Sequence, residues 1–231
     1  MANFLIGGIK KSSLMEFPNK ISAIIFTQGC NFNCGFCHNP MLLKANEGNY
    51  TINSFFDFLE TRKGKLDGVV ITGGEPTLQL DLKYVIKRIK NMGFIVKLDT
   101  NGYKPEVLKD LLSENLLDYI AMDIKAPLEK YSFVANINTD TDKIQKSIEL
   151  IMNSSIDYEF RTTFMPYYHK IEDFEKIGLM IKGAKKYYLQ KFEVQSEINN
   201  PDLKNEKNYS DKDIEKIINI LKRYVLNTEL R

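Results

Sequence analysis

The sequence predicts an α/β fold, a partial (β/α)6 TIM-like barrel with parallel strands and outer helices. Short apolar, β-branched runs alternate six times with segments whose apolar residues recur every three or four positions. The first pattern is typical of buried strands and the second of helices packed on one face. Such alternation predicts a parallel sheet covered by helices. The 231 residues suit a single domain, 1–231, and are few for a closed eightfold barrel, which takes about 250.

The first half of the chain contains three strand–helix units. Before them, we expect Gly7-Gly8 to break the short apolar run Phe4–Ile6, and Phe17–Lys20 to form a turn. Thr51 is a candidate N-cap, and Pro105 occupies a favourable first-turn position. The expected strands are Ile21–Thr27, Gly68–Thr72 and Ile95–Asp99, and the expected helices are Ile52–Leu59, Leu82–Met92 and Pro105–Asn115.

The second half repeats the pattern, with a capping-box-like Ser210-x-x-Asp213 before the last helix. The expected strands are Tyr119–Asp123, Tyr158–Phe164 and Lys186–Phe192, and the expected helices are Ile144–Met152, Ile171–Met180 and Ile214–Tyr224. Two long connections remain. We interpret Pro127–Asp142 as a candidate lid and Asn199–Ser210 as a polar loop within the domain.

Composition excludes several classes of partner. Lys plus Arg total 32 and Asp plus Glu total 30, so nothing in the net charge favours nucleic acid or an anionic membrane. No apolar run approaches the roughly 20 residues that span a bilayer, and the first 20 residues carry no signal-peptide pattern. The expectation is a cytoplasmic protein, whose odd number of cysteines argues against a disulfide framework.

All three cysteines fall in one short stretch, as Cys30-x3-Cys34-x2-Cys37 directly after the first strand. Three thiols can supply three protein ligands to one metal centre, and the fourth ligand must come from outside. This arrangement favours a cubane iron–sulfur cluster with one open iron. The alternative is structural zinc with His38 as the fourth ligand, but adjacent residues such as Cys37 and His38 chelate one ion poorly.

Gly73-Gly74-Glu75-Pro76 follows the second strand. Glycine and proline explain it as a tight turn. Paired glycines also let a ligand approach the backbone closely, and Glu75 adds an acceptor for an ammonium group.

Charged residues end the next strands, and the carboxyl ends of parallel strands form the active-site face. Asp99 and Asp123 either cap the following helices or face a ligand. Lys125 and Arg161 either are solvated or meet a carboxylate; Arg161 lies in a strand with alternating apolar residues, where an unpaired charge is costly.

The cysteine spacing followed by Gly73-Gly74-Glu75-Pro76 resembles the radical S-adenosylmethionine enzymes. Further stretches resemble the activating proteins of anaerobic ribonucleoside-triphosphate reductase and related glycyl-radical activases, from about residue 4 to residue 195. They are Gly7–Leu14, Phe26–Cys30, Cys37–Pro40, Asp99–Gly102, Met122–Pro127 and Gln190–Gln195. The strand-five glycine pattern of many such enzymes is not evident at Arg161–Pro166. With three cysteines, the chain cannot build a second thiolate-bound cluster.

The resemblance implies a role for each matched residue. Cys30, Cys34 and Cys37 would bind three irons of a [4Fe–4S] cluster, and S-adenosylmethionine would chelate the fourth. The residues implied to contact this cofactor are Phe36, His38, Asn39, Gly73, Gly74, Glu75, Asp99, Thr100, Asp123, Lys125 and Arg161. Among them, Gly73, Gly74 and Glu75 would receive the ammonium, and Lys125 and Arg161 would lie near the carboxylate. Asp99, Thr100 and Asp123 would contact the ribose or ammonium, or hold a small cation.

The implied activity is radical chemistry with no catalytic residue beyond the cluster and cofactor ligands. A flavodoxin- or ferredoxin-type donor would reduce the cluster, and the partner would be a glycyl radical enzyme, the anaerobic ribonucleotide reductase. Three alternatives stay open. They are activation of another glycyl radical enzyme such as a formate-lyase type, radical chemistry on a small molecule such as a deazapurine-type ring contraction, and a non-catalytic zinc module.

Overall fold

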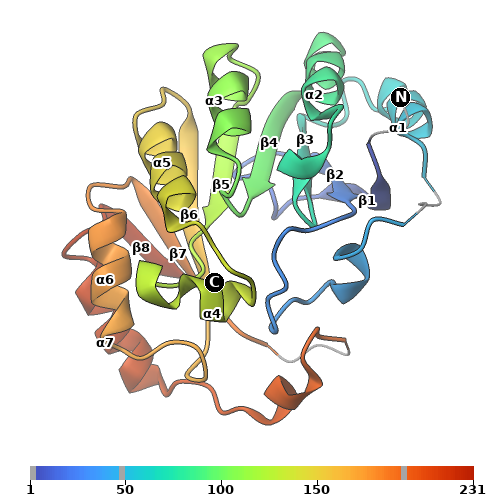
Figure 1. Cartoon of the computed structure of the whole chain (residues 1–231). Coiled ribbons are helices and arrows are strands. Elements are labelled where there is room, and N and C mark those ends of the chain that lie inside the picture. The colour runs from blue at the N-terminus through green and yellow to red at the C-terminus, as the bar shows by residue number, and fades with distance from the viewer. Residues whose placement is uncertain (1–3, 47–49, 194–196) are drawn as a thin grey trace.

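The computed structural model describes residues 4–46, 50–193 and 197–231, and the sheet at its centre has eight strands in the order of the chain. Strand β1 is antiparallel to β2, and each later pair of neighbours is parallel. The strands are β1 Ile6–Ser13, β2 Ser22–Thr27, β3 Gly68–Gly73, β4 Ile95–Thr100, β5 Tyr119–Asp123, β6 Asp157–Phe164, β7 Lys186–Lys191 and β8 Asn227–Leu230. Figure 1 shows the curved sheet with its larger helices on the outside, so the predicted fold class is confirmed.

The helices begin where local chemistry predicts. Thr51 caps α1 by accepting a hydrogen bond from the Ser54 amide at 3.1 Å, and Pro105 is in the first turn of α3. Ser210 caps α7 through the Asp213 amide at 3.3 Å. The helices are α1 Ile52–Glu60, α2 Leu82–Asn91, α3 Pro105–Ser113, α4 Tyr131–Ala135, α5 Thr141–Met152, α6 Asp173–Met180 and α7 Asp211–Leu221. Short 3-10 helices span Pro40–Leu42, Pro76–Leu78, Leu128–Lys130 and Pro201–Asn205.

Two strands lie outside the six that the sequence predicts. Gly7 and Gly8 do not break a strand, because β1 runs through both of them as an antiparallel edge. A Cβ on Gly7 would lie 2.3 Å from a methyl carbon of Leu42, so this glycine marks close packing rather than a turn. Strand β8 escapes prediction because it has four residues, of which only Thr228 is buried.

The connection Pro127–Asp142 is not a structureless lid. It contains α4, whose Tyr131, Val134 and Ala135 are buried. The Ala135 carbonyl also accepts a hydrogen bond from the Asn33 amide at 2.9 Å, within the cysteine loop. The segment is therefore packed against the rest of the fold and supports the cysteine loop.

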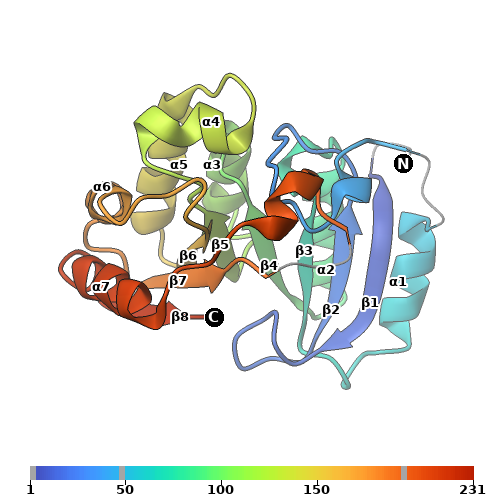
Figure 2. The same cartoon turned by 90° about the horizontal axis from the view of Figure 1, so that it is seen from below.

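The polar loop Asn199–Ser210 is likewise ordered. It includes the 3-10 helix Pro201–Asn205, whose Leu203 is almost completely buried. Figure 2 shows this orange-red segment crossing in front of the sheet toward the loop that follows β2.

The two faces of the sheet have different chemistry. The outer face and the helices share one large apolar core, while a small separate cluster of Phe17, Ile24, Val70 and Tyr119 lies apart from it. Lys97 and Glu159 are nevertheless buried within strands. Buried charges need partners. Glu159 accepts a hydrogen bond from the Tyr119 hydroxyl at 2.9 Å and lies 3.1 Å from Arg231 Nη1, and the partner of Lys97 is described below. Within the described ranges, no helix is both long and apolar enough to span a bilayer.

Candidate functional site

The cysteine loop leaves the end of β2 and is held by main-chain hydrogen bonds. The Gly29 amide donates to the Leu42 carbonyl at 2.9 Å, and the Cys30 amide donates to Leu43 at 3.1 Å. Within the motif, the Cys37 amide donates to the Cys34 carbonyl at 3.1 Å. Gly29 has φ of +88°, a conformation that favours glycine. The loop is thus closed on itself beside the strand ends.

A cavity of about 290 Å³ opens at this point, and every site residue predicted from the sequence lines it. Those residues are Cys30, Cys34, Phe36, Cys37, His38, Asn39, Gly73, Gly74, Glu75, Asp99, Thr100, Asp123, Lys125 and Arg161. They come from the ends of five consecutive strands, which are parallel and therefore meet at one edge.

Sequence reasoning missed six residues of the lining: Phe32, Leu43, Thr72, Asn101, Thr163 and Gln190. Thr163 lies two positions after Arg161 on β6, so the period of two along a strand was a signal that could have found it. Nothing in the sequence marks Leu43, which reaches the cavity through the 3-10 turn after the cysteine loop.

The three thiols are free; Cys34 is buried, and Cys30 and Cys37 are half-buried. Burial raises the pKa of Cys30 to about 12 and that of Cys34 to about 11. Without a metal, the thiols of Cys30 and Cys34 keep their protons at neutral pH. Metal binding would displace those protons, as thiolate coordination requires.

The donor set fits a cluster better than a single ion. Across the residues that the structure describes, no three His, Cys, Asp or Glu side chains are arranged to hold one metal ion. A cubane cluster makes no such demand, because each thiolate binds a different iron. In addition, the buried Nε2 of His38 has no hydrogen-bond partner among the described residues, and the side chain lines the cavity. A buried polar atom needs a hydrogen-bond partner, which a ligand bound in the cavity would supply.

Glu75 is the most heavily bonded residue of the site. Its Oε1 accepts from the Thr77 amide at 3.1 Å and from the hydroxyls of Thr77 and Thr100 at 2.5 and 2.7 Å. Its Oε2 accepts from the Asn101 amide at 2.7 Å. Burial raises the pKa of Glu75, and these hydrogen bonds oppose that rise. The residue therefore ties the ends of β3 and β4 together.

Five charged side chains form a continuous chain across β4, β5 and β6. Lys97 Nζ lies 2.6 Å from Asp99 Oδ1, and Arg161 Nη1 lies 3.2 Å from Asp99 Oδ2. Arg161 Nε and Lys125 Nζ each lie 2.9 Å from an oxygen of Asp123. Three cations thus share two carboxylates, which leaves one positive charge in excess within this chain. Asp99, Asp123, Lys125 and Arg161 line the cavity, whereas Lys97 is buried and does not line it.

This charge chain changes two sequence interpretations. Lys125 and Arg161 are neither solvated nor unpaired, since protein carboxylates already bind them. Asp99 and Asp123 do not cap the helices that follow them, because the N-cap of α3 is Lys104 and the N-caps of the 3-10 helix Leu128–Lys130 and of α4 are Pro127 and Lys130. Burial raises the pKa of both aspartates, but the neighbouring cations outweigh it and hold each pKa below its ordinary value.

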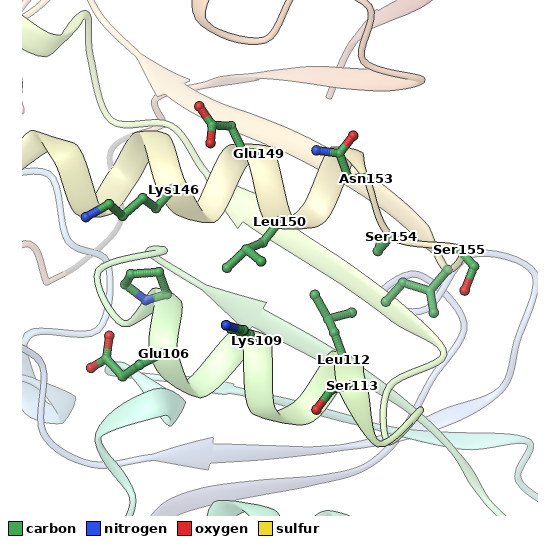
Figure 3. Close-up of a pocket in the computed structure, with 12 residues that line it drawn as sticks. Glu106, Lys109, Leu112, Ser113, Lys146, Glu149, Leu150, Asn153, Ser154 and Ser155 are labelled. Carbon is green, nitrogen blue, oxygen red and sulfur yellow. The ribbon is translucent and has the colours of Figure 1, made fainter.

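A second cavity, of about 720 Å³, lies between α3 and α5 on the outside of the barrel. Figure 3 shows Leu112 and Leu150 between the two helices, with Lys109 on α3 and Lys146 on α5, while Glu149 projects from α5 away from α3. It contains none of the predicted site residues. Although this second cavity is the larger, the smaller cavity is the candidate site because it contains the cysteines and most of the charge chain.

Comparison with known proteins gives a consistent result. A family model described as "Radical SAM superfamily" matches residues 24–182. The chain is 39% identical over 197 residues to "Putative glycyl-radical enzyme activating enzyme MJ1227" of Methanocaldococcus jannaschii, a match that covers 82% of this chain and 80% of the relative.

Two solved structures share the fold at low sequence identity. Streptococcus suis SuiB matches with a TM-score of 0.66 and 14% identity over 88% of this chain and 47% of the SuiB chain. SuiB has also been solved bound to S-adenosylmethionine. A domain of pyruvate-formate lyase-activating enzyme from Bacteroides vulgatus matches with a TM-score of 0.55 and 15% identity over 71% of this chain and 98% of that domain.

Proposed function

The chain belongs to the radical S-adenosylmethionine superfamily, and from that premise we propose that it is an activase that generates a glycyl radical on a partner enzyme. A [4Fe–4S] cluster with S-adenosylmethionine supplies the radical chemistry when bound, through reductive cleavage to methionine and a 5′-deoxyadenosyl radical. The single observation that carries the proposal is the cavity in which three thiols face the ends of β3 to β6.

The cluster would be held by Cys30, Cys34 and Cys37. Main-chain hydrogen bonds hold the cysteine loop in place, so the three ligands are preorganised for iron binding. Phe32 and Phe36 are buried beside them and exclude water from that side of the cavity.

The charged residues would orient the amino-acid part of the cofactor. The excess positive charge of the charge chain favours binding of a carboxylate at the ends of β5 and β6. At the ends of β3 and β4, Oε2 of Glu75 accepts one hydrogen bond from the protein and has the capacity for another. An ammonium group would supply that donor. A carboxylate held at the ends of β5 and β6 and an ammonium group held at Glu75 would fix one orientation of the ligand.

The partner that we propose is the anaerobic ribonucleotide reductase, with a flavodoxin- or ferredoxin-type protein as electron donor. Support for this partner comes from the motif similarity of Gly7–Leu14 and Cys37–Pro40 to its activating proteins. The name of the M. jannaschii relative supports a glycyl radical enzyme as the partner without saying which one. The test is anaerobic incubation with candidate glycyl radical enzymes, cofactor and reductant. An electron-spin doublet should form on the reductase. A doublet on a formate-lyase-type enzyme alone would reassign the partner.

Two alternatives predict different products. An enzyme acting on a small molecule would consume the cofactor and leave no radical on any protein partner. A zinc module would bind zinc tightly and yield no 5′-deoxyadenosine after reconstitution with iron and sulfide, even with a strong reductant and partner present. Measurement of 5′-deoxyadenosine therefore separates enzyme from module, and spin resonance separates the two kinds of enzyme.

A further inference from the structure

A segment distant in sequence lies across the cysteine loop. Residues 198–209, here called the strap, connect the end of β7 to α7 and include the 3-10 helix Pro201–Asn205. The strap is anchored by buried Ile198 and Leu203, and the Tyr209 hydroxyl donates to the His169 carbonyl. It is therefore attached to the barrel at both of its ends and at its centre.

Asn199 of the strap makes the main contact with the cysteine loop. Its Nδ2 lies 3.2 Å from the Asn33 carbonyl, 3.1 Å from the Cys34 carbonyl and 2.8 Å from the Asn33 side-chain Oδ1. Its backbone amide donates to the Cys37 carbonyl at 3.1 Å. One residue thus bonds to both peptide groups that flank the Cys34 Cα, and to the carbonyl of the last cysteine.

The neighbouring contact, between Asn200 and Gly35, explains why a glycine occupies position 35. The Asn200 amide donates to the Gly35 carbonyl at 2.8 Å. A Cβ on Gly35 would lie 2.4 Å from the Tyr168 hydroxyl and 3.2 Å from both Asn200 Cβ and Leu203 Cδ1. Any larger side chain at this position would push the strap or Tyr168 away, so Gly35 permits the close approach.

These contacts determine where a thiol points. The orientation of a Cα–Cβ bond follows from the two peptide planes beside it, because side-chain geometry is built on the backbone. On the other side of the loop, the Asn33 amide is bonded to Ala135. The Cys34 backbone is therefore held from two directions, by α4 and by the strap.

We propose that Asn199 is a positioning residue whose side chain holds Cys34 in the conformation that binds iron. The inference rests on the proposed cluster but not on the identity of the partner enzyme. Groups that orient metal ligands typically change metal affinity by about 10- to 100-fold when they are removed. Asn199 fits this role because its bonds go to the backbone of the ligating residues and leave the sulfur atoms free.

The test is the rate at which reconstituted protein loses iron to a chelator under anaerobic conditions. Asn199→Ala should lose iron about tenfold faster than the unsubstituted protein, in line with that range. The matched control is Asn200→Ala. Among the residues that the structure describes, the Asn200 side chain accepts a hydrogen bond only from the Asp202 amide of its own strap, at 3.1 Å, and its contact with the cysteine loop uses the backbone amide. Iron loss from this control should match the unsubstituted protein. Equal rates for all three proteins would overturn the proposal.

A second pair of variants separates positioning from general stability. Asn199→Asp keeps the size of the side chain but replaces its donors with an acceptor facing three oxygen atoms, so iron loss should be faster than in Asn199→Ala. Asn199→Gln retains the carboxamide and should restore slow loss. The metal-free variants should melt within a narrow range of each other. If iron loss instead followed melting temperature across the series, Asn199 would be a structural residue only.

The result is distinguishable from a failure of the proposed function. If the unsubstituted protein assembled no cluster on its cysteines, the proposed function itself would fail. If it assembled one and Asn199→Ala retained it equally well, only the positioning role would be lost. The spin-resonance spectrum of the reduced cluster gives an independent readout, and it should change in Asn199→Ala but not in Asn200→Ala.

Discussion

Glu75 shows how a single motif residue serves the fold as well as the ligand. The sequence predicts a carboxylate facing an ammonium group, whereas the structure places four protein donors around it, at 2.5 to 3.1 Å. A buried acceptor with this many donors is costly to change, because each donor left without a partner retains its desolvation penalty.

We expect Glu75→Gln to lower the free energy of unfolding by about 1–3 kcal/mol, because the new amide group faces donors that need an acceptor. Urea denaturation of the metal-free protein measures this loss. Glu149→Gln, at an exposed position on α5, is the matched control and should leave the midpoint unchanged. A midpoint for Glu75→Gln that equals the control would show that these hydrogen bonds contribute no net stability.

At the scale of elements, the site depends on how closely strand ends approach each other. Gly73 ends β3 with φ of +121°, and a Cβ there would lie 2.2 Å from the Thr27 amide nitrogen of β2. The adjacent Gly74 faces the Gly29 carbonyl in the same way, at 2.3 Å. The glycine pair therefore brings β3 against the start of the cysteine loop, in addition to any contact with a ligand.

Gly73→Ala should destabilise the protein by about 4 kcal/mol or more, since backbone atoms cannot move aside as a side chain can. Gly93→Ala is the control, because its φ of +92° imposes conformational strain while no atom lies within 4 Å of the added carbon. That strain alone costs about 1–2 kcal/mol. Equal losses in the two variants, measured by denaturant unfolding, would refute the steric explanation.

The charge chain joins three strand ends and gives them a common electrostatic role. Arg161→Ala removes the excess positive charge and should weaken S-adenosylmethionine binding by about 10- to 100-fold, the equivalent of one charge-assisted hydrogen bond of about 1.5–3 kcal/mol. The iron content of the protein should stay the same, because Arg161 forms its ion pairs with Asp99 and Asp123 and not with a cysteine. Arg161→Lys, which retains the charge, should lose less. Unchanged affinity in Arg161→Ala would show that the carboxylate binds elsewhere.

At the scale of the whole molecule, the charge chain should make the free energy of unfolding depend on pH. The pKa values of Asp99 and Asp123 lie below their ordinary values in the folded state. Groups of this kind stabilise the fold above the unfolded-state pKa, about 3.9, and their contribution is lost as the pH falls through the lower folded-state value.

Arg161→Met should therefore cost about 3 kcal/mol at pH 7, within the range for breaking a buried ion pair. The difference from the unsubstituted protein should shrink below about pH 4, because protonated carboxyl groups no longer need a cation. Arg223→Met breaks an exposed pair with Glu175 and should show little effect at either pH. Unfolding curves collected from pH 7 to pH 3 test this; a constant difference across that range would contradict it.

Local sequence determined the outline of this protein. Periodicity located β2 to β7 and the six longer helices that follow them, because burial on one face imposes a period on the chain. The cysteine spacing, the polar strand ends and the family resemblance together named fourteen of the twenty residues that line the candidate site, because parallel strands bring their carboxyl ends to one edge.

Only the tertiary structure decided how those residues are bonded. Arg161 meets Asp99 from 62 positions away, and Asn199 meets Asn33 from 166 positions away. No local pattern encodes such pairings, because they depend on which side chains face the interior once the sheet has curved. For the same reason, the sequence presents Asn199–Ser210 as a polar loop, whereas the folded chain places it across the cysteines.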